Sequence, residues 1–369
     1  QANIYDKESD LYNKFFADLD AVQAVFAANQ SYAGLKKFDA SYSGNMEKWS
    51  KLVNSMRLKL AIRISKVDPT LAKTQGEKAM SDAAGLISSN GDNFRVSLYG
   101  GKLPMNVIAF EWGDTRMGSG MESFGVGMKD NRIASYFAPV ADASLVSDHP
   151  DWPYKGIHSG AYLDAKDQRL PFSTPNESFK VQESRRYFTY SEVCHLKAEA
   201  ALRGWAGAGD AKTNYEDGVR ASFADWGAGG VDAYLADATS TPIDYVDPLE
   251  PRNNWTSRSD VTPAWNDADS NERKLEKIIT QKWFNNFTNS LEAWTDHRRT
   301  GYPKLPYNTR NDSSADWGVI PADEFIKRMP WPNGERDNNK DGVADATTKL
   351  GGPDLISTRL WWDTGGSNF

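Results

Sequence analysis

The segment from Ile278 to Leu305 constrains the fold more than any other, because it combines helical periodicity with a dense set of aromatic residues. Apolar residues recur every three or four positions from Leu275 to Trp283, and the pattern resumes in 291–298 after an asparagine-rich interruption. Gly301 and Pro303 then end it. The aromatic residues of the segment are Trp283, Phe284, Phe287, Trp294 and Tyr302. The segment therefore predicts two consecutive helices, anchored by aromatic side chains, in the scaffold of a helical protein.

Two carboxylates of this segment, Glu292 and Asp296, lie four positions apart and so on one face of the second helix. Such a pair could supply the acid and the base of a glycoside hydrolase. The alternative is that both are ion-paired, with Arg298, with Arg299 or with a distant helix. We expect ion pairs, because charges beside bulky aromatic rings are rarely left without a partner.

Helical periodicity elsewhere predicts a mainly α fold. Arg185–Trp205 contains a helix with a seam of alanines, and Asp210 can cap a second helix after the break at Gly204. Two antiparallel helices joined by a short turn form a tetratricopeptide-like unit, and Met46–Ala83 and Leu275–Arg298 predict further pairs of this kind. We expect one domain over residues 1–369, with its helical scaffold in residues 5–87, 185–230 and 269–303.

Between the scaffold segments, residues 88–184 and 231–268 are rich in Gly, Asn, Asp and Pro, and a tail follows from 304 to 369. Long loop regions in a compact domain usually serve function. Aromatic rings in them can stack on the C–H faces of a sugar. The predicted ligand-binding residues are Trp112, Trp152, Tyr154 and Trp265. The rings on helical stripes, those of Trp49, Trp283 and Trp294, are expected in the core.

Composition excludes several classes of protein. The net charge of −7 and the pI near 5.3 argue against binding to nucleic acid or to an anionic membrane surface. The single cysteine, Cys194, cannot form an intrachain disulfide. The sequence contains no G-x-S-x-G, H-E-x-x-H or P-loop motif and no apolar run of the ~18 residues that a membrane span needs. It therefore predicts a binding protein more readily than an enzyme.

One stretch has the pattern of a calcium loop. Asp337, Asn339, Asp341 and Asp345 place oxygen ligands at positions 1, 3, 5 and 9 of an EF-hand-type loop, with Gly342 at the turn. The twelfth position is Thr348 instead of the usual glutamate, and an ordinary surface turn can have the same residues. A structural calcium ion is thus one of two interpretations, and no other cofactor is predicted.

Four separated stretches resemble the SusD/RagB family of nutrient-binding lipoproteins. They are W-S-K-L-V-N-S-M-R-L-K-L-A-I-R-I-S at Trp49–Ser65, R-R-Y-F-T-Y-S-E-V-C-H-L-K-A-E-A-A-L-R-G-W at Arg185–Trp205, T-Q-K-W with E-A-W-T-D-H-R-R-T-G-Y-P at Thr280–Pro303, and G-G-P-D-L-I-S-T-R-L-W-W-D at Gly351–Asp363. Together they span nearly the whole chain in the order found in the family.

The resemblance implies a non-enzymatic protein on the outer-membrane surface, with tetratricopeptide-like helical pairs and ligand-binding loops. Such proteins deliver oligosaccharides, or peptides in the RagB-like branch, to a SusC-like TonB-dependent transporter. Their ligand residues vary, so none is carried over to this chain. Members normally begin with a lipidated cysteine and further helices, which this sequence lacks, and we expect the lipid anchor in the full-length precursor. An oligosaccharide binder, a peptide binder and a glycoside hydrolase remain the alternatives.

Overall fold

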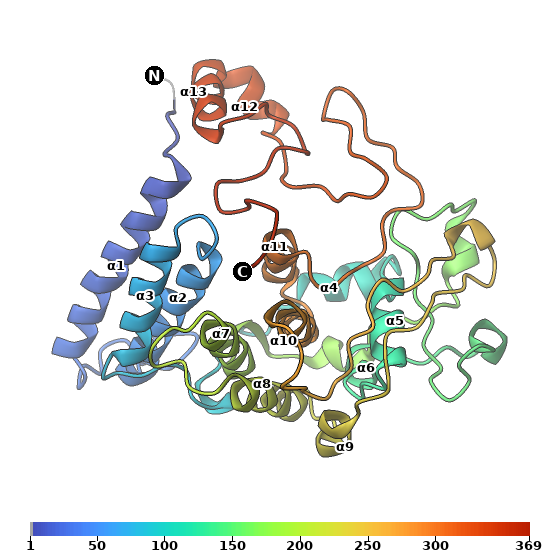
Figure 1. The fold of residues 1–369 in the computed structure, drawn as a ribbon, viewed down its shortest axis with the longest axis horizontal. Helices are drawn as coiled ribbons and strands as arrows, with labels where there is room; N and C mark the ends of the chain where they lie inside the picture. Colours follow the sequence, from blue (N-terminus) through green and yellow to red (C-terminus); the bar gives the residue numbers. More distant parts are fainter. Residues whose placement is uncertain (1–2) are drawn as a thin grey trace.

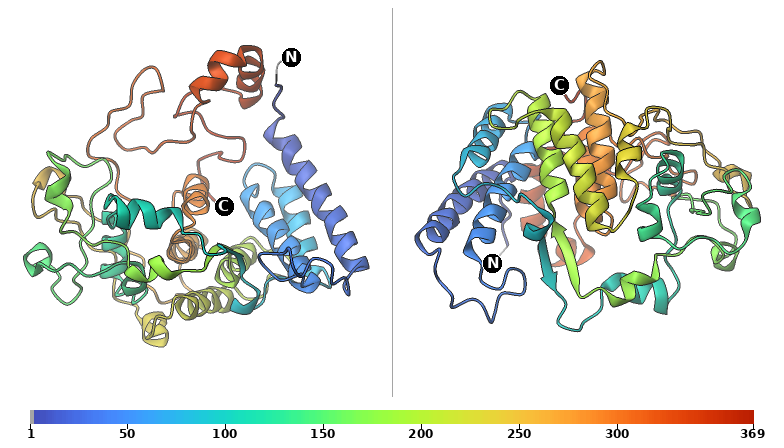
Figure 2. Two further views of the ribbon diagram at one scale, coloured as in Figure 1. Left: turned by 180° about the vertical axis from the view of Figure 1, so that it is seen from behind. Right: turned by 90° about the horizontal axis from the view of Figure 1, so that it is seen from below.

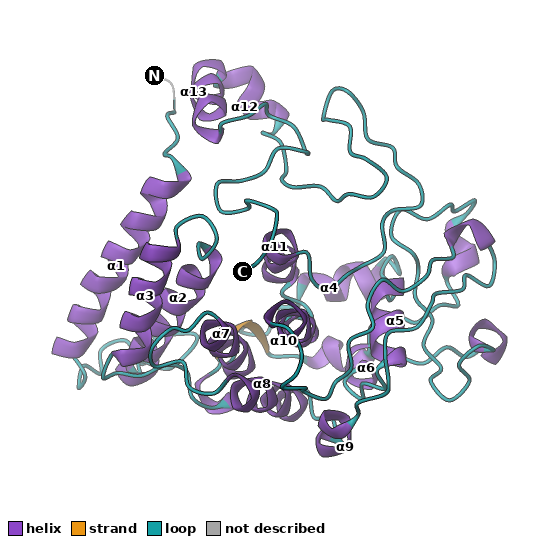
Figure 3. Cartoon of the chain, in the orientation of Figure 1, coloured by secondary structure: helices purple, strands orange, loops and turns teal. Residues whose placement is uncertain are grey.

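The computed structural model describes residues 3–369, and the described chain is mainly α-helical (Figures 1 and 3). The helices are α1 (Glu8–Ala28), α2 (Met46–Arg63), α3 (Pro69–Ser81), α4 (Pro104–Asn106), α5 (Ser119–Gly127), α6 (Ile133–Tyr136), α7 (Tyr190–Leu202), α8 (Ala211–Asp225), α9 (Val231–Ala236), α10 (Asn271–Asn285), α11 (Ser290–Thr300), α12 (Asn333–Asn338) and α13 (Lys340–Leu350). Strands β1 (Phe94–Ser97) and β2 (Ser184–Phe188) form an antiparallel ribbon, drawn as arrows in the right view of Figure 2. The predicted mainly α fold is confirmed.

The scaffold consists of helices that are neighbours in sequence and pack together. α2 packs on α3 and α7 on α8, while α10 packs on α7 and leads into α11. In Figure 1, α1–α3 lie on the left, α7, α8, α10 and α11 in the centre, and the long loops on the right. Side chains cap the N-termini of five of these helices, where Asn45, Asp68, Thr189, Asp210 and Ser270 accept from backbone N–H groups of α2, α3, α7, α8 and α10. The expected helical pairs and the cap at Asp210 are therefore present.

The close approach of α7 and α8 depends on one glycine. A Cβ atom at Gly218 of α8 would lie 2.8 Å from Nε2 of His195 on α7, which is shorter than any normal contact. The hydroxyl of Ser191 on α7 donates to the Gly218 carbonyl at 2.7 Å. Small residues thus bring the two backbones together, as the alanine seam of this segment predicts.

Buried charges connect the pairs to one another. Glu292 on α11 is ion-paired with Arg63 on α2 at 2.6 Å, and Asp296 with Lys282 on α10 at 2.8 Å. Glu199 on α7 accepts both guanidinium NH₂ groups of an α11 arginine, Arg299, at 2.6 and 2.7 Å. The expectation that Glu292 and Asp296 are ion-paired is confirmed. Their charges hold α2, α7, α10 and α11 together.

The C-terminal tail departs from the expected loop. The proposed calcium loop is not a loop in the structure: Asp337 lies in α12, while Asp341 and Asp345 lie in α13. The physical reason is a set of contacts with the start of the chain. Asn339, between the two helices, exchanges hydrogen bonds with the backbone of Asn3 at 3.0 and 3.1 Å, and a neighbouring tyrosine hydroxyl donates to Glu335 of α12 at 2.6 Å.

Candidate functional site

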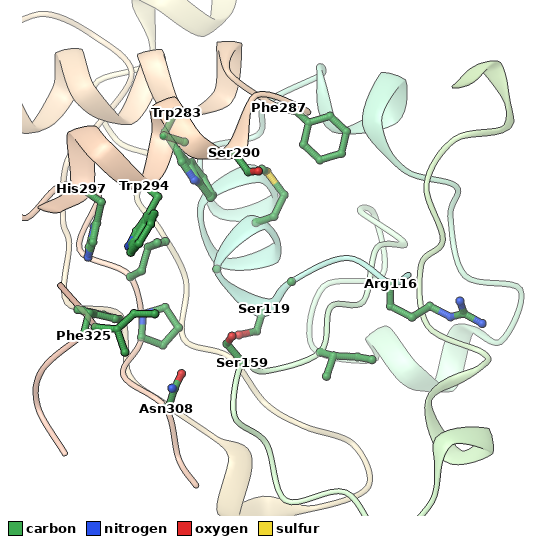
Figure 4. A pocket seen from close by; sticks show the side chains of 18 of the residues that line it. Arg116, Ser119, Ser159, Trp283, Phe287, Ser290, Trp294, His297, Asn308 and Phe325 are labelled. Carbon is green, nitrogen blue, oxygen red and sulfur yellow. The ribbon is translucent and has the colours of Figure 1, made fainter. Parts of the chain in front are cut away.

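A cavity of about 700 Å³ lies where the α10–α11 turn faces the N-terminus of α5 (Figure 4). A third side is formed by the tail between Leu305 and Ile326, and a fourth by the loop around Ile157 and Ser159. This volume is within the range of ligand pockets, roughly 300–1,000 Å³. The cavity is the candidate binding site of the described chain.

One wall of the cavity is aromatic. Trp283 of α10, Phe287 of the turn and Trp294 of α11 line it, and Phe325 of the tail completes it (Figure 4). The guanidinium carbon of Arg298 lies 3.7 Å from the Trp294 ring centroid, so one face of this ring is already covered. The remaining face is available to a ligand.

The turn that presents these rings is strained. Thr288 has φ = 75°, a left-handed conformation that is an outlier for a β-branched residue. Asn286 closes α10, and Asn289 begins α11 without a side-chain cap. Backbone strain of this kind occurs preferentially at functional sites. The asparagine-rich interruption in the sequence corresponds to this turn.

The uncharged polar groups of the cavity are few, and they come from α5, α11, the loop around Ser159 and the tail. Ser119, the first residue of α5, is only 1% exposed; its hydroxyl accepts the indole N–H of Trp255 at 3.1 Å and lies 3.2 Å from Nδ1 of His158. The side chains of Ser159, Ser290 and Asn308 line the cavity and are exposed to solvent. Three neutral polar groups therefore border the cavity with donors and acceptors free for a ligand.

Few charged groups line the cavity, and each is already engaged. Arg116 donates to the backbone carbonyls of Gly113, Thr115 and Leu170 at 2.7–3.1 Å. The carboxylate of Glu324 is paired with Lys327 at 3.2 Å. The third titratable group is His297, whose ring packs perpendicular to Phe325.

Burial affects the ionisation of two of these groups. Burial lowers the pKa of His297 to about 4, so the imidazole is neutral at pH 7. Burial also lowers the pKa of Arg116, although the negative charge of Asp114 raises it. Asp114 is ion-paired with Lys166. Arg116 remains a cation without a carboxylate partner within 4 Å in the described chain.

None of the four aromatic residues predicted to bind ligand lines this cavity. Trp112 is 62% exposed, beyond a π-helical turn at Val107–Glu111. Tyr154 is 8% exposed, and Trp152 and Trp265 pack against the hydrophobic core. Ligand binding by these four residues therefore stays a prediction, and the structure brings none of them together with the others in one cavity.

Two tryptophans that were expected in the core, Trp283 and Trp294, are half-buried and line the cavity. Trp283 also packs against the core, with its ring centroid 5.8 Å from that of Phe124 on α5. Their spacing on a helical stripe gave no indication of this. The adjacent asparagine-rich turn was the available signal, since such turns present side chains at the end of a helix.

The carboxylates proposed to bind calcium do not converge. Among the described residues, one group of three potential metal ligands has its atoms within 4.8 Å of one another, and it is Glu122, Asp148 and His149. In that group Glu122 already accepts the ammonium of the fully buried Lys155 at 2.6 Å. Glu122 and Lys155 thus form a buried ion pair beside the exposed Asp148, and calcium binding at Asp337–Asp345 stays a prediction.

Within residues 3–369, no helix has the length and apolar character that crossing a membrane requires. A search of curated proteins finds no similar sequence.

Solved structures of SusD homologues match over nearly the whole chain. A chitin-binding SusD homologue from Flavobacterium johnsoniae is 38% identical, with a TM-score of 0.93, over 100% of this chain and 75% of that one. A SusD homologue from Bacteroides vulgatus is 34% identical, with a TM-score of 0.91, over 99% and 73%. One from Bacteroides uniformis is 36% identical, with a TM-score of 0.87, over 98% and 74%.

The family comparison agrees with these structures. Residues 1–363 match the model of the SusD-like family, described as the Susd and RagB outer membrane lipoproteins. The tetratricopeptide-like helical pairs described above are consistent with its fold. The chain belongs to the SusD-like family.

Proposed function

We propose that this protein binds an oligosaccharide in the α10–α11 cavity, does not cleave it, and delivers it to a SusC-like TonB-dependent transporter at the outer-membrane surface. The observation that carries the proposal is the aromatic wall of Trp283, Phe287, Trp294 and Phe325 in a cavity of about 700 Å³ that uncharged polar groups border. A pyranose has the matching character, because its C–H faces are apolar and its edge carries hydroxyls.

Trp294 is suited to stacking, because it is held in place before a ligand arrives. Arg298 covers one face of the ring and donates to the backbone carbonyl of Lys327 at 2.7 Å, which fixes the guanidinium. A sugar that stacks on the open face then causes little further loss of side-chain entropy at Trp294, and such preorganisation favours affinity. Stacking on one ring contributes about 1–2 kcal/mol.

Catalysis has no support in the cavity. A glycoside hydrolase needs two carboxylates roughly 5–10 Å apart that face the substrate. Among the described lining residues Glu324 is the sole carboxylate, and Glu292 and Asp296 are held in ion pairs elsewhere. The Ser119 hydroxyl near His158 is 1% exposed and engaged with Trp255, so it is not placed to attack a substrate.

Two relatives support a ligand class. The Flavobacterium johnsoniae homologue binds chitin, and a second, 27% identical structure with a TM-score of 0.76 is also a chitin-binding protein. We therefore propose β-linked N-acetylglucosamine oligomers as the first ligands to test. A peptide is the second candidate, because the apolar wall would also accept apolar side chains and the family includes RagB proteins.

The test is isothermal titration calorimetry with chitin, cellulose and starch oligomers and with a peptide library. Trp294→Ala should weaken binding of the preferred sugar about tenfold, the loss expected for one stacked ring. Trp112→Ala, an exposed tryptophan outside the cavity, is the matched control and should bind normally. Chromatography after overnight incubation should recover intact oligomer.

The opposite result would redirect the proposal. Loss of binding in Trp112→Ala with normal binding in Trp294→Ala would move the site to the 88–184 loops. Binding of peptides alone would favour the RagB-like function, and release of shorter sugars at an enzymatic rate would contradict a pure binding protein.

A further inference from the structure

Among the described residues that line the cavity, Glu324 supplies the one carboxylate, and it is ion-paired with Lys327 at 3.2 Å. Arg116 is a cation whose N–H groups donate to backbone carbonyls. His297 is neutral at pH 7. We infer that the cavity selects uncharged N-acetylated hexosamines and rejects the same sugars once they are deacetylated. This inference rests on the proposed function.

Deacetylation changes the sugar in one respect that matters here, since it replaces a neutral acetamide with an amine that is protonated at acidic and neutral pH. A buried ammonium needs a carboxylate partner, because removing it from water is costly. The one carboxylate of the described lining, that of Glu324, is already paired with Lys327 at 3.2 Å, and the positive charge of Arg116 disfavours a second cation.

The acetamide group, in contrast, finds complementary neighbours. Its methyl group can pack on the apolar side chains of the lining, including Met121 and Phe287. Its carbonyl and N–H can hydrogen-bond with the neutral groups at the cavity edge, which are the hydroxyls of Ser159 and Ser290 and the amide of Asn308 (Figure 4). Neutral donors and acceptors satisfy an amide without requiring a change in charge.

The experiment compares a chitin tetramer with its fully deacetylated counterpart, by calorimetry at pH 5.5 and at pH 8.5. At pH 5.5 we expect the deacetylated tetramer to bind about tenfold more weakly, because its ammonium groups would be partly desolvated beside the rings without a carboxylate partner. At pH 8.5 the amines of the deacetylated tetramer are largely neutral, so the difference in affinity between the two tetramers should narrow at least several-fold. The affinity for the acetylated tetramer should change little between pH 5.5 and pH 8.5.

A charge introduced into the lining should reverse the preference. Ser290 is the first residue of α11, where aspartate is favoured by the helix dipole, so Ser290→Asp should fold normally. At pH 5.5 this variant should gain at least tenfold affinity for the deacetylated tetramer, and Ser290→Asn, its neutral isostere, should not. Glu324→Gln should leave the deacetylated tetramer as weak as before, because its carboxylate is not the recognition group.

The outcomes separate the two proposals. Equal binding of both tetramers at pH 5.5 would overturn the charge inference and leave the proposed function standing. Equal binding of the cellulose and chitin tetramers would overturn the role of the acetamide. Failure of every oligosaccharide to bind to the folded protein would contradict the proposed function itself.

Discussion

The buried carboxylate of Glu199 should control how the stability of this protein depends on pH. Glu199 lies on α7, is 1% exposed, and accepts four hydrogen bonds from Arg299 and Arg203 at 2.6–3.0 Å. Through Arg299 it connects α7 to α11, the helix that carries Trp294. The proposed perturbation is Glu199→Gln, which keeps the shape of the side chain and removes its charge.

The size of the effect can be worked out from the structure. Burial alone would favour the neutral carboxyl, but the charges of Arg299 and Arg203 outweigh it and hold the pKa of Glu199 at about 2, against 4.5 for a free glutamate. A difference of about 2.5 in pKa corresponds to about 3 kcal/mol. Because the pKa is lowered in the folded state, this contribution is present above pH 4.5 and is lost as the pH falls toward 2. Removing the charge while both arginines remain buried should cost about 3–5 kcal/mol at pH 7.

The assay is chemical denaturation of the wild type and of Glu199→Gln at several pH values between 7 and 3. The difference in free energy of unfolding should be largest at pH 7 and should shrink steadily below pH 4.5. Glu177→Gln, at an exposed glutamate, is the matched control and should follow the wild type. A difference that stays constant down to pH 3 would refute the reasoning, because the ionisation of Glu199 would then not be what stabilises the fold.

Three further predictions concern other parts of the chain. Trp265→Ala should lower the free energy of unfolding by about 2–4 kcal/mol and leave glycan affinity unchanged, because the Trp265 ring packs with its centroid 5.2 Å from that of Tyr215. Thermal unfolding and calorimetry check this, and weakened binding without destabilisation would contradict it. Calcium added back to the chelated protein should leave the melting temperature unchanged, because Asp345 is already paired with Lys349 at 2.5 Å. A rise in melting temperature on adding calcium would support the predicted ion site. His149 should stabilise the fold at low pH, because Glu122 raises the pKa of its imidazole although burial alone would lower it. The stabilisation is complete below pH 6.5 and is lost as the pH rises through the pKa of the folded state. The free energy of unfolding of His149→Gln, measured against pH, checks this.

Sequence reasoning located the helices well, because each scaffold helix buries one face and so has an apolar stripe. The caps at Asp210 and the stop at Gly301, which has φ = 80°, were predicted for the same local reasons. The ion pairs of Glu292 and Asp296 were also predictable, since a buried charge requires a partner. The partners themselves were not, because Arg63 is more than 200 positions away from Glu292 in the sequence.

The candidate site could be predicted only in part. A helical stripe indicates which face is covered but not whether a cavity lies beneath it, so Trp283 and Trp294 were assigned to the core. Loop residues were assumed to be exposed, yet Trp152 and Trp265 pack on the core because their loops fold back onto the scaffold. The wall formed by Leu305–Ile326 has no periodicity at all, so no local signal indicated that the tail closes the cavity.

The composition of the cavity wall also determines when, during synthesis, the protein can acquire its proposed activity. The wall begins at Met105 and ends at Ile326, and Arg298 is held against Trp294 by a carbonyl of the tail. When only the first three hundred residues have been synthesised, both tryptophans are therefore present. Phe325 is still missing, and so is the Lys327 carbonyl that accepts from Arg298. Non-local contacts of this kind form late and slowly. Binding competence should accordingly appear as one of the last events in maturation, and a chain shortened before Phe325 should lose the site.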